Sequence, residues 1–229
     1  MAKIILPKYP AILPSSGKTV SFRPFTVKEE KSLLLALQEG DAATVTMAIK
    51  NVIDVCTDGE VNPDEVPYYD VEFLYMQIRS KSIGEVIDLV GSCDCSPTAK
   101  TPFSVDIADI QVLPAPSGRQ MIKIPDTPYT VEFDHPTISD FSKTFNVAQD
   151  SSVEVVANCM KSVFTEDEVL DWSMKEKMEF VESMTSKQQK DMAKFLDDMP
   201  MVKLPVSYKC CKCGELNQET ISGMESFFV

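Results

Sequence analysis

Residues 19–29 read Thr-Val-Ser-Phe-Arg-Pro-Phe-Thr-Val-Lys-Glu, and residues 130–140 repeat the pattern as Thr-Val-Glu-Phe-Asp-His-Pro-Thr-Ile-Ser-Asp. The two stretches lie 111 positions apart, so Val20 matches Val131 and Phe22 matches Phe133. In each stretch, a short run that alternates apolar and polar residues predicts a strand. A threonine with an acidic residue three positions later then predicts the capped start of a helix.

Three further matches keep the same order along the chain. Residues 12–15 resemble 112–115, residues 51–61 resemble 159–169, and the Cys-x-Cys triplet at 93–95 matches the one at 211–213. Matches in one order with similar spacings indicate a tandem duplication. Two copies of one module usually build a pseudo-symmetric body, and such bodies more often bind or assemble than catalyse.

The expected fold is α+β, with two tandem pseudo-repeats. Each repeat is expected to hold a short strand, three to four helices and a Cys-bearing β-hairpin that resembles a zinc-ribbon knuckle. Pro7, Pro10 and Pro14 predict an extended arm because proline disfavours helix. The predicted boundaries are an arm over 1–16, a first repeat module over 17–110, a Pro-rich linker over 111–130 and a second repeat module over 131–229.

Apolar periodicity and capping residues place the helices. In the first module they are expected from Thr26 to Gly40, over about 42–55 and from about Asp70. In the second module they are expected over about 151–164, and after caps at Ser173 and Ser186. Strands that lead into and out of the cysteines are expected over 85–90, 103–107, 201–208 and 219–221.

Composition narrows the classes of partner. The chain has 229 residues and a net charge of −13. Nucleic acids and anionic membranes require a positive footprint, so neither is an expected partner. No segment reaches the length of a transmembrane span, so membrane insertion is not expected. Seven cysteines, without a secretory signal, favour a reducing compartment with thiols or metal ligands over a disulfide framework.

Four of the cysteines predict a metal site. Cys93 and Cys95 form one pair and Cys210 and Cys213 form another, each expected at a tight turn between two strands. A tetrahedral Zn²⁺ site needs four ligands, which two such turns together supply. The Cys-x-x-Cys-Gly spacing at 210–214 is standard for a zinc knuckle, whereas Cys-x-Cys is one residue shorter. The alternatives are therefore a shared zinc ion and two degenerate knuckles with free thiols.

The remaining chemistry-bearing residues do not predict an enzyme. Cys56 and Cys159 lie on apolar helix faces and are expected in the core. The only histidine, His135, precedes a proline in a predicted strand-to-helix turn. No glycine-rich phosphate loop and no nucleophile elbow is present. The expectation is that the protein is not an enzyme and has no catalytic residues, although a thiol enzyme using Cys210 or Cys213 is an alternative.

Two strings resemble a known family. Residues 22–35 read Phe-Arg-Pro-Phe-Thr-Val-Lys-Glu-Glu-Lys-Ser-Leu-Leu-Leu, and residues 78–86 read Ile-Arg-Ser-Lys-Ser-Ile-Gly-Glu-Val. With the Leu-Pro-x-Tyr segment at 6–9 and the overall length, they resemble the T4-type bacteriophage baseplate protein family. Its members are baseplate-hub subunits or hub-assembly factors of contractile-tailed phages.

The resemblance implies a structural or chaperone-like role in building the phage tail. Expected partners are other phage tail or baseplate hub proteins, and no catalytic residues carry over. The implied location is the host cytoplasm during assembly and the tail baseplate of the virion. The alternative function is that of a non-viral soluble zinc-ribbon adaptor protein.

Overall fold

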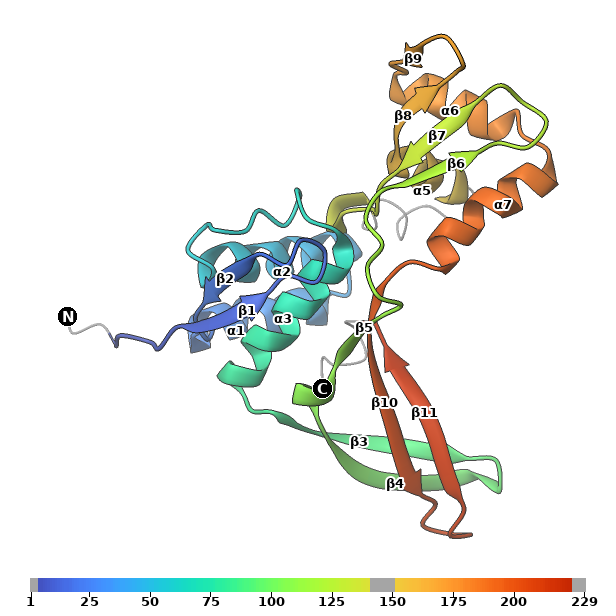
Figure 1. Ribbon diagram of the computed structural model, residues 1–229. Coiled ribbons are helices and arrows are strands. Elements are labelled where there is room, and N and C mark those ends of the chain that lie inside the picture. Colours follow the sequence, from blue (N-terminus) through green and yellow to red (C-terminus); the bar gives the residue numbers. More distant parts are fainter. Residues whose placement is uncertain (1–3, 141–150, 224–229) are drawn as a thin grey trace.

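The computed structural model describes residues 4–140 and 151–223 and shows an α+β protein with three parts (Figure 1). An N-terminal lobe spans residues 4–82, and a C-terminal lobe spans residues 120–199. A protrusion built from residues 86–113 and 201–222 extends away from both lobes. The α+β class expected from the sequence is confirmed.

The N-terminal lobe packs one β-hairpin against three helices. Its elements are β1 (Tyr9–Ile12), β2 (Thr19–Phe22), α1 (Val27–Glu39), α2 (Ala42–Cys56) and α3 (Tyr68–Ser82). The hairpin includes β1, so residues 9–12 of the segment expected as an arm pair with β2. Ile4 and Ile5 precede the hairpin and are exposed.

The start and end of α1 follow the predicted signals. Thr26 is the N-cap, and its backbone N–H and hydroxyl both donate to the Glu29 carboxylate, at 2.6 and 3.0 Å. Arg23 pairs with the same carboxylate at 2.7 Å, which holds the pKa of Glu29 down at about 2. Gly40 ends the helix with φ of 70°, a left-handed conformation that glycine adopts without a Cβ penalty.

The C-terminal lobe packs a four-stranded sheet, in the order β6-β7-β8-β9, against helices (Figure 1). Its elements are β6 (Gln120–Lys123), β7 (Thr130–Phe133), α5 (Ser151–Cys159), β8 (Met160–Phe164), β9 (Val169–Leu170), α6 (Met174–Glu182) and α7 (Ser186–Asp197). The strand β6 lies inside the segment expected as a Pro-rich linker.

Two sequence predictions for this lobe were wrong. The helix expected to reach Phe164 ends at Cys159, because Met160–Phe164 pairs with β7 as a strand, with Val163 opposite Val131. The pairing buries both valines fully, and this burial outweighs the local preference of the segment for helix. The cap of α7 is Thr185 and not Ser186: Thr185 donates to the Gln188 side chain and accepts from its N–H.

The first hairpins of the two lobes have the same register at the offset seen in the sequence. Tyr9 lies opposite Phe22, and Gln120 lies opposite Phe133, each pair 111 positions from its counterpart. After each hairpin the chain bonds to the end of a helix: Arg23 N–H donates to the Cys56 carbonyl and Asp134 N–H to the Cys159 carbonyl, both at 2.9 Å. These bonds make Cys159 the structural counterpart of Cys56, whereas the sequence match had paired Cys159 with Asn51. That the two repeat modules superpose over their whole length remains a prediction.

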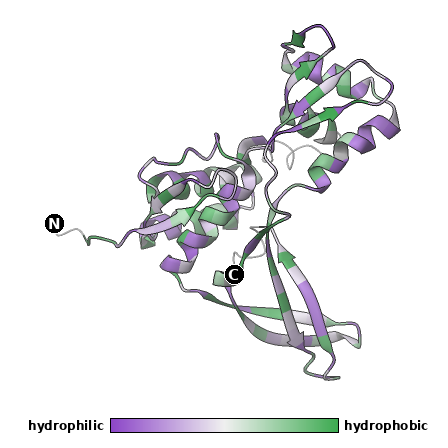
Figure 2. Cartoon of the chain, viewed as in Figure 1, coloured by the Kyte–Doolittle hydropathy of each residue, from purple (hydrophilic) through white to green (hydrophobic). Residues whose placement is uncertain are grey.

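The protrusion is made of two hairpins that cross (Figure 1). One joins β3 (Val86–Cys93) to β4 (Ser96–Asp106), which leads into a short 3₁₀ turn (Ile107–Asp109). The other joins β10 (Met201–Lys209) to β11 (Leu216–Ser222), and β5 (Gln111–Leu113) pairs with the base of β10. Figure 2 shows hydrophobic and hydrophilic segments along these strands. Buried residues alternate with less buried ones along β10, as expected for a strand with one buried face.

A glycine allows the two hairpins to approach closely. The Tyr208 ring of β10 lies over Gly91 of β3, where an added Cβ would fall 2.1 Å from Cζ of the tyrosine. The same ring stacks on Phe103 of β4, with centroids 4.5 Å apart and planes 14° apart. The Tyr208 hydroxyl donates to the Ser92 carbonyl at 2.6 Å. The crossing therefore depends on a residue without a side chain at position 91.

His135 lies at the junction of the two lobes. Its ring is buried, stacks on Phe195 of α7 at 5.0 Å and meets the edge of Tyr69 of α3 at 5.3 Å. Beside it, the Tyr68 N–H of α3 donates to the Pro136 carbonyl at 2.9 Å. Neither ring nitrogen of His135 has a hydrogen-bond partner among the residues that the structure describes. The imidazole therefore acts there as a packed ring.

Gly91→Ala should lower the free energy of unfolding by about 2 kcal/mol or more, because the new methyl group displaces the Tyr208 ring. Chemical denaturation measures the effect. In a Tyr208→Ala background the same glycine substitution should cost much less, since the clashing ring is gone. Equal costs in both backgrounds would contradict the crossing at this residue.

His135→Phe should keep the stacking and remove two buried polar atoms, raising stability at neutral pH by about 1 kcal/mol. Burial also lowers the pKa of His135, so the unfolded chain binds the proton more readily. The free energy of unfolding should thus be highest above the ordinary histidine pKa of about 6.5 and should fall as the pH drops below that value. Denaturation at pH 7.5 and pH 5 should show that the variant loses less stability than the parent. A larger loss in the variant would refute the packing role.

Candidate metal centre

The crossing brings the two cysteine pairs together at the tip of the protrusion. Cys93 and Cys95 lie at the β3–β4 turn, and Cys210 and Cys213 lie at the β10–β11 turn. All four sulfur atoms lie within 4.8 Å of one another. Cys93 and Cys210 are buried, whereas Cys95 and Cys213 are exposed. These four cysteines, called the cysteine cluster below, could hold a metal ion.

The distances within the cysteine cluster suit a tetrahedral ion. The Cys93 and Cys213 sulfurs are 3.7 Å apart, and the Cys95 and Cys210 sulfurs are 3.6 Å apart. Four sulfurs placed 2.3 Å from a central Zn²⁺ form a tetrahedron with edges of about 3.8 Å. Both short contacts join one hairpin to the other, so they bridge positions 120 and 115 apart in the sequence.

The second turn presents backbone N–H groups to a sulfur. The Cys210 N–H donates to the Glu215 carbonyl at 2.8 Å, and the Gly214 N–H donates to the Cys210 carbonyl at 3.0 Å. Gly214 has φ of 74°, which the turn requires. The Lys212 N–H lies 3.4 Å from the Cys210 sulfur. Donation from the backbone of Cys213 and Lys212 lowers the pKa of Cys210 to about 6, whereas desolvation and hydrogen bonds with the neighbouring thiols raise the pKa of Cys95 to about 12. The thiolate that metals bind therefore forms more readily at Cys210 than at Cys95.

The same turn also docks on the first hairpin through neutral and charged hydrogen bonds. The Cys211 N–H donates to the Thr101 hydroxyl at 3.0 Å, and the Cys211 thiol donates to the Lys100 carbonyl at 3.4 Å. The Lys212 ammonium donates to the Ser96 and Thr98 hydroxyls at 3.1 and 2.7 Å. Sequence reasoning missed these contacts, because no spacing pattern links a lysine to hydroxyls more than a hundred positions away.

Cys211 lies outside the cysteine cluster. The sequence repeat matched Cys211 with Cys93, but the structure brings Cys210 next to the first pair and turns Cys211 toward Lys100. The ligand set expected from the Cys-x-x-Cys spacing and the set brought together by the fold are therefore the same. Whether these residues bind metal remains a prediction.

The other two predicted cysteines lie in the core, as expected. Cys56 and Cys159 are both almost completely buried. Burial raises the pKa of each thiol to about 12, so both are protonated and poor nucleophiles at neutral pH. They contribute to the apolar cores of the N-terminal and C-terminal lobes respectively.

The thiol-enzyme alternative gains no support from the described residues. His135 lies at the lobe junction, and the cysteine cluster lies at the tip of the protrusion. A hollow of about 300 Å³ at the junction is lined by His135 and by charged residues, of which Arg119 and Asp134 pair at 3.0 Å. That hollow contains no cysteine.

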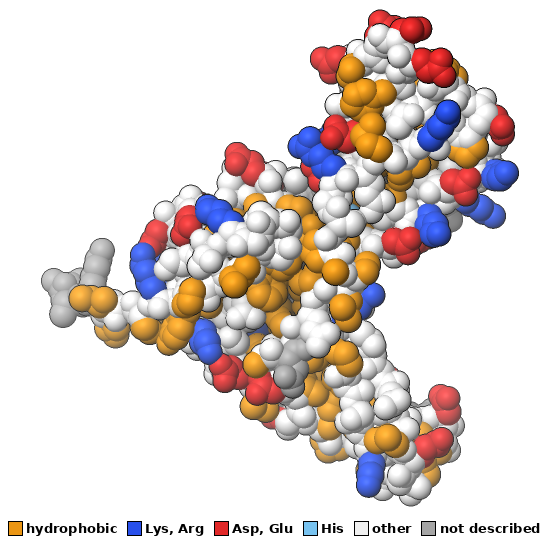
Figure 3. Space-filling view, viewed as in Figure 1, with side chains coloured by type: hydrophobic (Ala, Val, Ile, Leu, Met, Phe, Trp, Pro, Cys, Tyr) orange, Lys and Arg blue, Asp and Glu red, His pale blue; other side chains and the backbone are white. Residues whose placement is uncertain are grey.

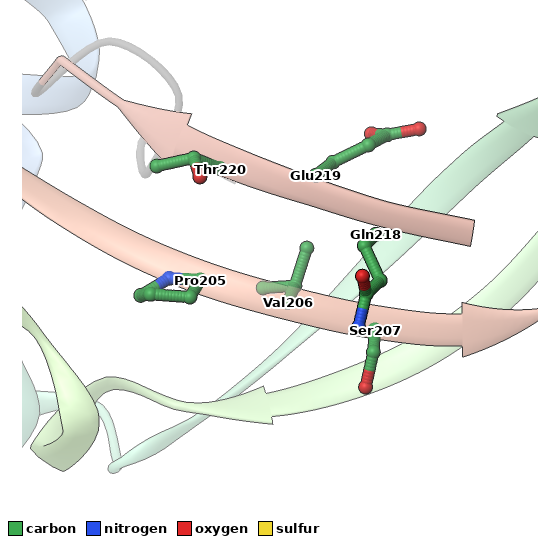
Figure 4. A pocket seen from close by; sticks show the side chains of 6 residues that line it. All are labelled: Pro205, Val206, Ser207, Gln218, Glu219 and Thr220. Carbon is green, nitrogen blue, oxygen red and sulfur yellow. The ribbon is translucent and has the colours of Figure 1, made fainter. Parts of the chain in front are cut away.

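A second hollow, of about 420 Å³, lies on β10 and β11 (Figure 4). Its lining residues are Pro205, Val206, Ser207, Gln218, Glu219 and Thr220. The Glu219 carboxylate lies 2.5 Å from the Tyr208 hydroxyl oxygen, whose one proton is shared between this carboxylate and the Ser92 carbonyl. That contact ties β11 to the aromatic ring at the crossing, so the carboxylate has a structural partner there.

Comparisons with known proteins identify the family. A family model described as T4 bacteriophage base plate protein matches residues 6–229, nearly the whole chain. No curated protein and no solved structure matches significantly. Within the described residues, no helix has the length and apolar character needed to cross a membrane. The match covers both lobes and the protrusion, and the chain therefore belongs to the T4 bacteriophage base plate protein family.

Proposed function

We propose that this protein builds the tail of a contractile phage by binding other tail proteins at the baseplate hub. The observation that carries the proposal is the family match over residues 6–229. The baseplate role follows from the family; the hub and binding as the mode of action are the proposed refinements. The protein would act in the host cytoplasm during assembly and then in the tail baseplate.

The described surface offers apolar side chains for such binding. Ile4 and Ile5 are 88% and 95% exposed, and Ile12 on β1 is 62% exposed. Burying one such side chain contributes roughly 1.5–3 kcal/mol to binding. Figure 3 shows hydrophobic side chains along the N-terminal segment and over the region where the three parts meet.

The first hairpin also has an open edge. β1 belongs to a two-stranded sheet and pairs only with β2 among the described strands. An open strand edge accepts an added strand from a partner, with main-chain bonds supplying affinity. The net charge of −13 favours a basic partner and disfavours nucleic acid. Residues 4–12 are therefore the binding element in this proposal.

The metal in this proposal is zinc, and its role is structural. The cysteine cluster supplies four thiolates, which fill a tetrahedral coordination shell and leave no position for a substrate. The duplication proposed from the sequence fits this arrangement, since each half gives one cysteine-bearing hairpin. The same cluster is the observation that favours the second candidate, a soluble zinc-ribbon adaptor outside a phage tail.

Deletion of residues 1–7 should leave the body folded, because the hairpin begins at Tyr9 and the Lys8–Asp58 pair is kept. The truncated protein should bind tail-hub proteins at least about tenfold more weakly, since it lacks two exposed isoleucines. Pull-down from infected cells and phage yield on complementation measure the effect.

Two variants sharpen this test. The double substitution Ile4→Ser and Ile5→Ser should reproduce the deletion. Val169→Ser is the control: it removes an apolar side chain of the C-terminal lobe that is 62% exposed, and this variant should bind normally. Unchanged thermal unfolding shows that each variant is folded. Normal hub assembly by the truncated protein would contradict the proposal that residues 4–12 are the binding element.

A further inference from the structure

We infer that the cysteine cluster binds one Zn²⁺ ion, and that this ion fastens the C-terminal hairpin across the N-terminal one. This deepens the structural role proposed for zinc, because the ion would hold the second hairpin in place across the first. A baseplate role would stand without it. Three features of the protrusion support it: the ligand geometry, the absence of a ladder between the hairpins, and the small apolar core at the tip.

The ligands are already arranged for the ion. The contacts of 3.6 and 3.7 Å between sulfurs are near the edge length of a zinc tetrathiolate. The turn that carries Cys210 and Cys213 is held on the first hairpin by Lys212 and Cys211, so binding requires little rearrangement. A site organised in advance loses less conformational entropy when the ion binds.

Thiolate ligands in tetrahedral array select the metal. Soft sulfur donors favour zinc or iron over the hard cations calcium and magnesium, which take oxygen ligands. Four protein ligands close the shell, which is the arrangement of structural zinc sites. Iron in a tetrathiolate would colour the protein, so the two metals are distinguished by absorbance and elemental analysis.

The other ties between the hairpins near the tip are the hydrogen bonds of Cys211 and Lys212 and the contacts of Tyr208. β3 and β4 form one sheet, and β10 and β11 belong to another, so no backbone ladder joins the two hairpins. The apolar cluster at the tip consists of Cys93, Ala99 and Cys210, which bury little apolar area. The free energy of metal binding therefore becomes the main stabilising contribution at this end of the protrusion.

The ion would also connect distant parts of the chain. Cys93 and Cys213 are 120 positions apart. A link between them closes a long loop, and restricting such a loop removes conformational entropy from the unfolded chain. Zinc binding is thus coupled to folding of the whole protrusion, although β10 is also anchored at its base in the N-terminal lobe.

The test compares serine substitutions of two exposed cysteines, one inside the cysteine cluster and one outside it. Cys95→Ser removes a ligand at little cost in packing, because this side chain is exposed and no spare cysteine lies on its hairpin. Cys211→Ser is the matched control, since Cys211 is exposed, lies in the opposite turn and is outside the cluster. The full-length proteins are purified without chelator, and metal content is measured by elemental analysis.

The parent and Cys211→Ser should each carry about one zinc per chain, and Cys95→Ser should bind zinc at least about 100-fold more weakly. A chelator should lower the melting temperature of the first two proteins and leave that of Cys95→Ser unchanged. Less than a small fraction of one zinc in the parent, iron in its place, or equal zinc retention in Cys95→Ser would overturn the inference.

Thiol alkylation gives a second readout that does not depend on stability. Cys95, Cys211 and Cys213 are all exposed, so the reagent can reach each of them, and the rate at each position is compared before and after chelation. With zinc bound, only Cys211 should react quickly, and the chelator should release the other two. Peptide mapping that finds Cys95 and Cys213 as reactive as Cys211 before chelation, or a Cys93–Cys213 disulfide, would also overturn it.

Discussion

The base of β10 packs into the core of the N-terminal lobe, and the rest of the arrangement depends on this packing. Val202, Leu204 and Val206 of β10 belong to the same buried cluster as Leu74 and Ile78 of α3. At the point of entry, the Val202 N–H donates to the Glu72 carboxylate, which is fully buried. A buried carboxylate is costly unless hydrogen bonds satisfy it, so this bond fixes the position of β10 as well as stabilising it. Because β10 continues to Cys210, its anchor in the N-terminal lobe determines where the second cysteine pair meets the first.

Local signals in the sequence were sufficient for the elements whose ends are set by their own residues. The capping box at Thr26, the stop at Gly40 and the strands leading to the cysteines all follow from nearest-neighbour chemistry. The strand β8 could not be found in this way, because Met160–Phe164 is a strand only through its pairing with β7. The cap at Thr185 was missed for a related reason: Thr185 and Ser186 each have a glutamine three positions later, and local sequence does not choose between them.

The candidate site was predictable in its residue types and not in its surroundings. The Cys-x-x-Cys-Gly spacing identified Cys210 and Cys213 as a zinc knuckle. Because a tetrahedral zinc site needs four ligands, Cys93 and Cys95 were predicted as the second pair. The crossing that brings the pairs together requires Gly91 to lie beneath Tyr208, and such a contact between distant strands leaves no periodic trace in the sequence. The burial of His135 between Phe195 and Tyr69 was missed for the same reason, although its place in a strand-to-helix turn was foreseen.

The protrusion is too small to be held by a core of its own, and this limits how it can be rigid. One face of its strands is open to solvent, with Val86 and Val90 of β3 exposed. Segments of this size bury too little apolar surface for independent stability, and they usually need a metal, a disulfide or docking to a larger body. Here β10 docks in the N-terminal lobe at the base, the Tyr208 ring lies over Gly91 along the shaft, and the thiols converge at the tip. With contacts at base, shaft and tip, the two hairpins can keep one crossing geometry without a large core. If the protein binds tail proteins as proposed, such a fixed geometry favours binding, because each freely moving element would have to be ordered on binding at a cost in affinity.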